Sequence, residues 1–145
     1  MKSFVFFLYL LLCSQAVYAA DHVKKTEKGL FSINLSMVGK TLENGVNAFD
    51  LVVRDKKGKS VDEAELAVTP WLPAMGQGVW DKPVVTVRGR GKYHVSNIVT
   101  TINGRWELKI AVNKGSLKDR AVFFFEVANA GPAPRENAYV PRGNY

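Results

Sequence analysis

The sequence predicts an all-β protein, a seven-stranded antiparallel β-sandwich of immunoglobulin-like type. Apolar and polar residues alternate in several short runs, which is typical of strands with one buried face. Turn-forming residues separate these runs at regular spacing, and no convincing helical run is present. The runs that we expect to form strands are residues 31–37, 49–53, 64–68, 84–87, 93–102, 105–112 and 121–127.

The first three runs have clear inward faces. The inward residues are expected to be Phe31, Ile33, Leu35 and Met37, then Phe49, Leu51 and Val53, then Ala64, Leu66 and Val68. A turn with Asp55 and Gly58 follows the second run. The third run is expected to stop at Pro70, because proline cannot donate a hydrogen bond to a strand ladder.

The dipeptide Asn103-Gly104 predicts a two-residue type I′ hairpin between residues 93–102 and 105–112. Its register would place Trp106, Leu108, Ile110 and Val112 opposite Thr101, Val99, Asn97 and Val95, with Tyr93 on the same face. Trp106 is then the expected core tryptophan. His94, Ser96, Ile98 and Thr100 would take the other face. In the last strand we expect Ala121, Phe123, Phe125 and Val127 to face the core, with Phe124 turned away.

The amino terminus has the features of an export signal. Lys2 precedes an apolar run at 4–12 that is too short to span a bilayer, and Ala19 is a suitable cleavage position. Leu12 before Cys13 argues against a lipoprotein. We therefore expect a signal peptide at 1–19 and a periplasmic or secreted protein, with no transmembrane span in the mature chain. The mature chain would comprise an N-terminal segment at 20–28, one domain at 29–128, and a flexible tail at 129–145 that is rich in proline and glycine.

The composition excludes several classes of function. Loss of Lys2 with the signal lowers the net charge from +7 to +6, and the cations are dispersed over predicted turns. Without aromatic residues interleaved on a strand face, these cations do not predict nucleic-acid binding. The one cysteine leaves with the signal, so the mature chain has no disulfide and no thiolate ligand. Two histidines and no nucleophile or metalloprotease motif predict a protein that is not an enzyme.

The segment 70–78 is the strongest candidate for function, because prolines and glycines shape it and large apolar side chains lie in and beside it. Two interpretations are open for Trp71, Leu72, Met75 and Trp80. They either plug one end of the sandwich or form an exposed patch that binds a partner. Copper(I) is an alternative ligand, held by Met75 with His94 or His22, although Met37 and His94 also fit purely structural positions.

The chain resembles the YtkA-like domain family, which overlaps with the soluble part of FixH-like proteins. The matching motifs are Gly45-x-Asn47-x-Phe49, Asp55-x-x-Gly58, Pro73-x-Met75-Gly76, Gly91-x-Tyr93 and Asn103-Gly104-x-Trp106, within residues 29–127. The resemblance implies a small sandwich of the bacterial envelope that is not an enzyme and is linked to copper handling or export systems. Many relatives carry a histidine where this chain has Gln77, so the loop lacks its second soft donor.

From these observations we expect a non-catalytic, exported β-sandwich module that binds another envelope protein through residues 70–80. A periplasmic copper accessory protein is the alternative.

Overall fold

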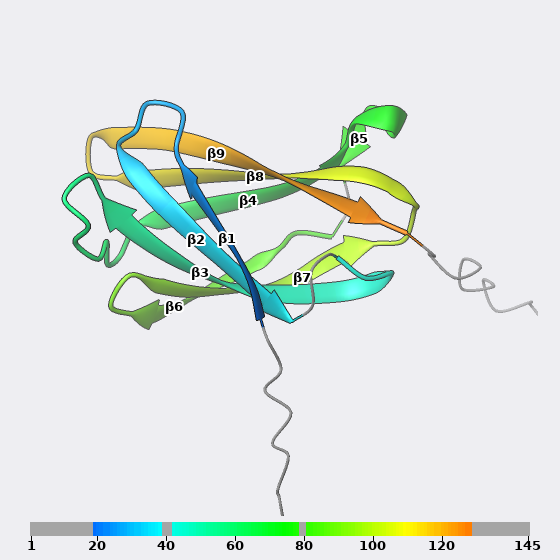
Figure 1. Ribbon diagram of the computed structural model, residues 1–145, viewed down its shortest axis with the longest axis horizontal. Helices are drawn as coiled ribbons and strands as arrows, with labels where there is room; N and C mark the ends of the chain where they lie inside the picture. Colours follow the sequence, from blue (N-terminus) through cyan, green and yellow to red (C-terminus); the bar gives the residue numbers. More distant parts are fainter. Residues whose placement is uncertain (1–18, 39–41, 79–80, 129–145) are drawn as a thin grey trace, which may run out of the picture.

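The computed structural model describes residues 19–38, 42–78 and 81–128. They form two antiparallel sheets packed face to face (Figure 1). The first sheet has the order β1-β2-β3-β7-β6 and the second the order β5-β4-β8-β9. The bounds are β1 Ala19–Lys25, β2 Phe31–Val38, β3 Gly45–Asp55, β4 Glu65–Leu72, the 3₁₀ turn η1 Pro73–Met75, β5 Gln77–Gly78, β6 Val84–Gly89, β7 Lys92–Thr100, β8 Gly104–Lys114 and β9 Leu117–Val127.

The all-β class and the two antiparallel sheets are confirmed. The count of seven strands is not, because β1 and the two-residue β5 were not expected. Most of the predicted signal peptide, the predicted tail and Trp80 lie outside the described residues. No helix within 19–38, 42–78 and 81–128 has the length and hydropathy needed to cross a membrane.

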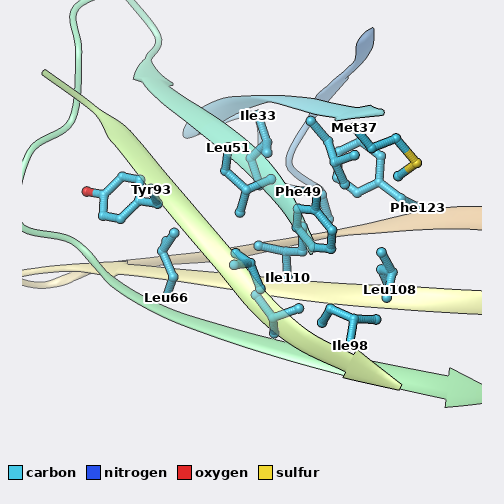
Figure 2. Close-up of a cluster of buried hydrophobic side chains, with 14 of the residues drawn as sticks. Ile33, Met37, Phe49, Leu51, Leu66, Tyr93, Ile98, Leu108, Ile110 and Phe123 are labelled. Atoms are coloured by element: carbon cyan, nitrogen blue, oxygen red, sulfur yellow. The ribbon is translucent and has the colours of Figure 1, made fainter. Parts of the chain in front are cut away.

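The core lies between the sheets, and the predicted alternation fills it on β2, β3, β8 and β9. Figure 2 shows Ile33 and Leu51 of the first sheet on one side and Leu108 and Ile110 of the second on the other. All four side chains are fully buried. Trp106 is 3% exposed, and its indole N–H donates to the carbonyl of Ile102 at 2.9 Å, so its predicted core position is confirmed.

The predicted Asn103-Gly104 hairpin is wrong. β7 pairs with β3 and β6, whereas β8 pairs with β4 and β9, so the connection crosses from one sheet to the other. None of the four cross-strand pairs expected for Trp106, Leu108, Ile110 and Val112 forms. A local turn preference contributes little compared with the apolar surface that each strand buries by joining a different sheet. A type I′ turn requires positive φ at both central residues, and Asn103 does not have it.

The predicted alternation of β7 also fails beyond its middle. Asn97 has φ 60°, and the register against β3 pairs Phe49 with Val95 but Asn47 with Ile98, which is one extra residue in β7. Such a bulge reverses the faces that follow it. Ile98 and Thr100 are therefore buried, contrary to the prediction.

β1 occupies the segment for which no strand was expected. It pairs with β2, and its Lys24 ammonium donates to the carbonyl of Val122 on β9 at 2.6 Å. The amide of Glu27 donates to the carbonyl of Arg120 at 2.8 Å. Since an open edge strand exposes unpaired carbonyls, these bonds cover the edge of β9 and join the two sheets on this side. His22 accordingly lies in a strand rather than near a loose terminus.

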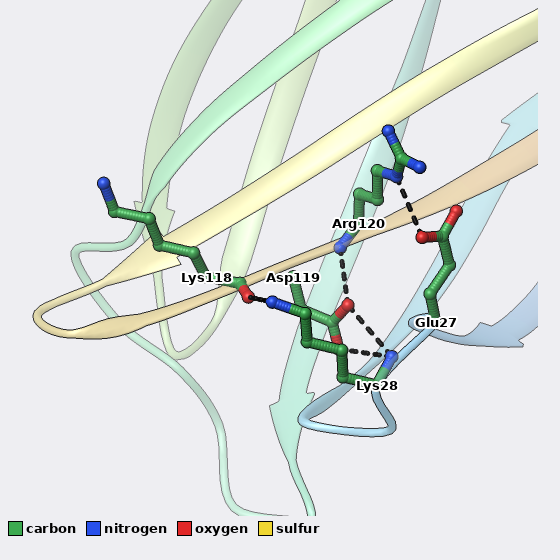
Figure 3. A network of polar contacts seen from close by, with 5 residues as sticks. All are labelled: Glu27, Lys28, Lys118, Asp119 and Arg120. Carbon is green, nitrogen blue, oxygen red and sulfur yellow. Dashed lines mark hydrogen bonds and ion pairs between the residues drawn. The ribbon is translucent and has the colours of Figure 1, made fainter.

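Asp119 of β9 fixes the β1–β2 turn (Figure 3). Its side chain is almost fully buried and accepts hydrogen bonds from the amides of Lys28, Leu30 and Arg120 at 2.9–3.1 Å. Burial by itself would raise the pKa of this carboxyl. The bonds from these amides and from the Thr26 side chain outweigh it and lower the pKa to about 2. An ion pair between Arg120 and Glu27, at 2.9 Å, lies beside this cluster.

Candidate functional site

The segment 70–78 is less of a loop than the sequence suggests. β4 continues through Pro70 and Trp71, which pair with Leu108 and Glu107 of β8. The Pro70 carbonyl oxygen lies close to Gly78 of β5, since a Cβ built on that glycine would be only 3.1 Å from it. This carbonyl therefore faces β5 and not β8. The backbone nitrogen and carbonyl of a strand residue point to the same side, so the missing N–H of Pro70 costs no bond to β8. The predicted stop at Pro70 is therefore wrong.

η1 makes the turn between β4 and β5, at the end of the sandwich opposite the β8–β9 turn (Figure 1). Gly76 closes η1 with φ 63°, and its amide donates to the Pro73 carbonyl at 3.0 Å. Met75, just before it, is 53% exposed. Thus the turn holds an apolar thioether in solvent on a defined backbone.

The four candidate residues of this segment do not form one patch. Leu72 is only 1% exposed, and a Cβ on Gly104 would lie 3.3 Å from it, so it plugs the end of the core. Trp71 is half-buried on the outer face of the second sheet. Met75 is exposed on η1, and Trp80 lies outside the described residues.

The second sheet brings Trp71 into line with an aromatic residue that the sequence placed only on an outer face. Trp71 pairs with Glu107, and Glu107 pairs with Phe124, so these three side chains form one row across β4, β8 and β9. Phe124 is 47% exposed. Sequence reasoning missed this row because its members are far apart in the chain and only the strand order makes them neighbours.

Cations lie over both rings. The Lys109 ammonium is 4.6 Å from the centre of the Trp71 ring and 3.6 Å from the Glu107 carboxylate. The Arg105 guanidinium is 4.6 Å from the Phe124 ring, and the Lys24 ammonium is 5.3 Å from it. We call Trp71, Phe124, Lys24, Arg105 and Lys109 the aromatic band. Aromatic and arginine side chains of this kind are enriched where proteins bind one another.

Neither histidine lies beside Met75, and His94 is on the other sheet from the rings of the band. His94 points outward from the first sheet, and its Nδ1 is 2.7 Å from the Asp50 carboxylate. The His22 ring packs edge-on against Phe125 at 5.2 Å, beside β9, at the opposite edge of the second sheet from η1. Among the described residues, no hydrogen-bond partner faces its buried Nε2.

These positions do not fit the expected copper site. Met75 lies at the end of the second sheet, His94 on the far face of the first, and His22 across the sandwich from η1. Met37 is in the core, 5% exposed. Within the part of the chain that the structure describes, no three His, Cys, Asp or Glu residues gather closely enough to hold a metal ion.

The family model that matches this chain is described as YtkA-like and covers residues 27–111, more than half of the sequence. The chain belongs to the YtkA-like family. No curated protein matches it.

Several solved structures resemble this YtkA-like chain in fold. A DUF4426 family protein from Pseudomonas aeruginosa PAO1 aligns with a TM-score of 0.52 and 15% identity over 72% of this chain and 94% of that one. FetP of uropathogenic E. coli strain F11, as isolated, aligns with a TM-score of 0.50 and 9% identity, over 75% of this chain and 94% of that one. A DUF4785 family protein from Legionella pneumophila aligns with a TM-score of 0.52 and 10% identity over 70% of this chain. The alignment spans only 29% of that protein. At these identities the likeness concerns the fold alone.

Most of the motifs that identify the YtkA-like domain have structural tasks in this chain. The Asn47 amide bridges the Thr100 hydroxyl and nearby carbonyls. The Tyr93 hydroxyl donates to the Val61 carbonyl at 2.6 Å and accepts from the Ala64 amide at 3.0 Å, and burial raises its pKa. Met75 differs from these residues, because its side chain is exposed and no such task accounts for it.

Proposed function

We propose that this YtkA-like chain is a non-catalytic binding module of the bacterial cell envelope, which engages a protein partner through the aromatic band and through Met75 on the η1 turn that follows β4. The proposal includes export by the signal at 1–19 and a sandwich of immunoglobulin-like type. One observation carries it. The rings of Trp71 on β4 and Phe124 on β9 lie in one cross-strand row and are partly exposed, and each ring has a cation over it.

Physical chemistry favours this face as a binding surface. A ring such as that of Phe124 buries a large apolar area when a partner covers it, at little cost in side-chain entropy. The cations over the rings lose part of their hydration in the same step, which strengthens each cation–π contact. Met75 adds a flexible thioether that adapts to different partner shapes.

The non-catalytic part of the proposal rests on the open position of the polar groups. The Asp50–His94 pair lies on an outward sheet face, with the Asp50 side chain 69% exposed. Acid–base catalysis and nucleophilic catalysis are most effective where a closed site excludes water.

Site-specific photocrosslinking tests this function. A photoreactive residue is placed at Phe124, at Met75, or at Leu117, which is exposed to the same 47% as Phe124 but lies at the β8–β9 turn. Phe124 and Met75 should capture the same envelope protein, and Leu117 should not. With that protein purified, W71A and F124A should each weaken binding roughly tenfold, whereas L117A should not. Equal capture from all three positions would refute the proposal.

Copper handling is a second candidate, at a different place from the one expected. Within 19–38, 42–78 and 81–128, the buried His22 Nε2 has no hydrogen-bond partner, and a polar atom in that state is costly unless something binds it. Met37 is the diagonal neighbour of His22 on the inward face of β1 and β2, since Ala20 pairs with Met37 and His22 with Leu35. A thioether and an imidazole are ligands that copper(I) accepts.

A copper(I) titration against a competing chelator separates these sites. If the second candidate holds, H22A and M37A should each abolish the binding, and M75A should leave it unchanged. Binding that only M75A removes would reject the His22 site, and no binding tighter than micromolar would reject copper handling altogether.

A further inference from the structure

The outer face of the first sheet carries a groove that the proposed function does not use. Its volume is about 470 Å³, and it runs over β2, β3, β7 and β6. The backbone of Leu51 and Tyr93, whose side chains are buried, contributes to its floor. We call it the β3–β7 groove, and its other lining residues are Ser36, Asp50, Val52, Arg88, Lys92 and His94.

Register places the polar side chains of the groove on one face. Ser36, Asp50 and His94 form one cross-strand row over β2, β3 and β7, and Val52 and Lys92 belong to the next row. Arg88 lies on the neighbouring β6, between Val87 and the bulged Gly89. Since residues two apart in a strand share a face, Lys92 and His94 border the groove together.

Two cations in this groove have no partner within the part of the chain that the structure describes. Neither the Arg88 guanidinium nor the Lys92 ammonium has a hydrogen-bond or ion-pair partner there. His94 is held through Nδ1 by Asp50, which fixes the ring and leaves Nε2 as its second polar atom. The one carboxylate in the lining is therefore already engaged.

We propose that the β3–β7 groove binds an oxyanion of the phosphate type, with Arg88 and Lys92 as its donors and His94 beside them. A guanidinium fork matches two oxygens of a phosphate, and an ammonium adds a point charge. The groove is shallow and larger than a bare phosphate needs, so it also admits the group that a phosphomonoester carries. That oxyanion comes either from a soluble phosphate compound or from a lipid headgroup.

The surrounding charge supports an anionic ligand. Arg54 of β3 and Lys25 at the end of β1 lie on the same outer face, because both pair with Ser32 of β2. The Arg54 guanidinium makes one hydrogen bond, to the Gly58 carbonyl. Several cations on one low-dielectric face raise the local concentration of anions. On the second sheet, in contrast, Lys109 and Arg120 are each paired with a glutamate.

The test uses two probes on the purified protein. Inorganic phosphate is titrated at ionic strength matched with sodium chloride, and the His94 imidazole resonances are followed by NMR. Cosedimentation is measured with vesicles of equimolar phosphatidylcholine and phosphatidic acid, against vesicles of phosphatidylcholine alone. The variant is R88A/K92A, and the control is K82A/K118A, which removes the same charge from exposed positions outside the groove. All four side chains are exposed, so both variants should fold, which equal thermal melts would verify.

R88A/K92A should weaken binding of the responsive probe roughly tenfold or more, and K82A/K118A should leave it within a factor of about two. A phosphate response without vesicle binding identifies a soluble ligand, and binding of phosphatidic acid vesicles identifies a lipid headgroup. The proposal is overturned if neither probe binds, or if both double variants lose affinity equally. Because the groove and the aromatic band lie on opposite sheets, W71A and F124A should not change this binding.

Discussion

Replacing Asp119 with asparagine should destabilise the protein at neutral pH and matter much less near pH 2. The Asp119 carboxylate accepts bonds from three backbone amides, and its pKa falls from 3.8 to about 2 in the folded protein. Above pH 3.8 the group is charged in both the folded and the unfolded chain, so its full contribution to stability is present. As the pH falls from 3.8 towards 2, the unfolded chain binds the proton first, and the contribution is lost.

The magnitude follows from the shift. The lowering of the pKa from 3.8 to about 2, at about 1.4 kcal/mol per pKa unit, would give about 2–3 kcal/mol. Although its own exposed area is small, Asp119 borders an open surface groove with Lys28 and Arg120, so solvent screening reduces this to about 1–2 kcal/mol. The amide nitrogen of asparagine would also face an N–H donor, which adds a cost that does not depend on pH.

Urea unfolding followed by tryptophan fluorescence at pH 7 and at pH 2.5 measures the effect. D119N should lower the free energy of unfolding by at least about 1–2 kcal/mol at pH 7. At pH 2.5 the difference from wild type should shrink by roughly two-thirds of that amount, because the folded carboxyl, with a pKa of about 2, is still mostly charged there. D81N serves as control, because Asp81 is exposed and should show neither change. A difference between D119N and wild type that is the same at both pH values would refute the reasoning.

Three further experiments test the fold. W106A should cost about 3–5 kcal/mol, because a buried indole and its bond to Ile102 are lost, and a thermal melt that barely moved would contradict this. G91A should destabilise the protein by about 3 kcal/mol, since its Cβ would lie 2.7 Å from the Val53 carbonyl oxygen. G115A has a similar φ but open space around the Cβ, so it should cost about 1–2 kcal/mol. Equal losses of stability in urea titrations would count against the Val53 contact. N97A should be less stable than N97G. Both variants lose the hydrogen bond to the Lys82 carbonyl, but a φ of 60° strains alanine and not glycine. The reverse order of melting temperatures would show that the bulge is not strained.

Part of the candidate site could be predicted from the sequence, and part could not. The sequence indicated Trp71 and Met75, because a tryptophan and a methionine among prolines and glycines are conspicuous in any chain. It could not indicate Phe124, Arg105 or Lys109 as their neighbours, since no local pattern joins β4 to β8 and β9. His94 was correctly placed on an outer face, but its partner Asp50 lies 44 residues away and became visible only through the pairing of β3 with β7.

The sequence by itself determined the class of the fold and the inward faces of β2, β3, β8 and β9, because side-chain alternation with a period of two is a local property of an extended chain. The tertiary structure alone decided which strands are neighbours. Asn103-Gly104 predicts a hairpin, yet β7 and β8 bury more apolar surface in separate sheets, and that non-local gain outweighs a turn preference. It likewise decided that β1 covers the edge of β9, because the Val122 carbonyl that Lys24 satisfies lies on an open sheet edge only after the second sheet has formed.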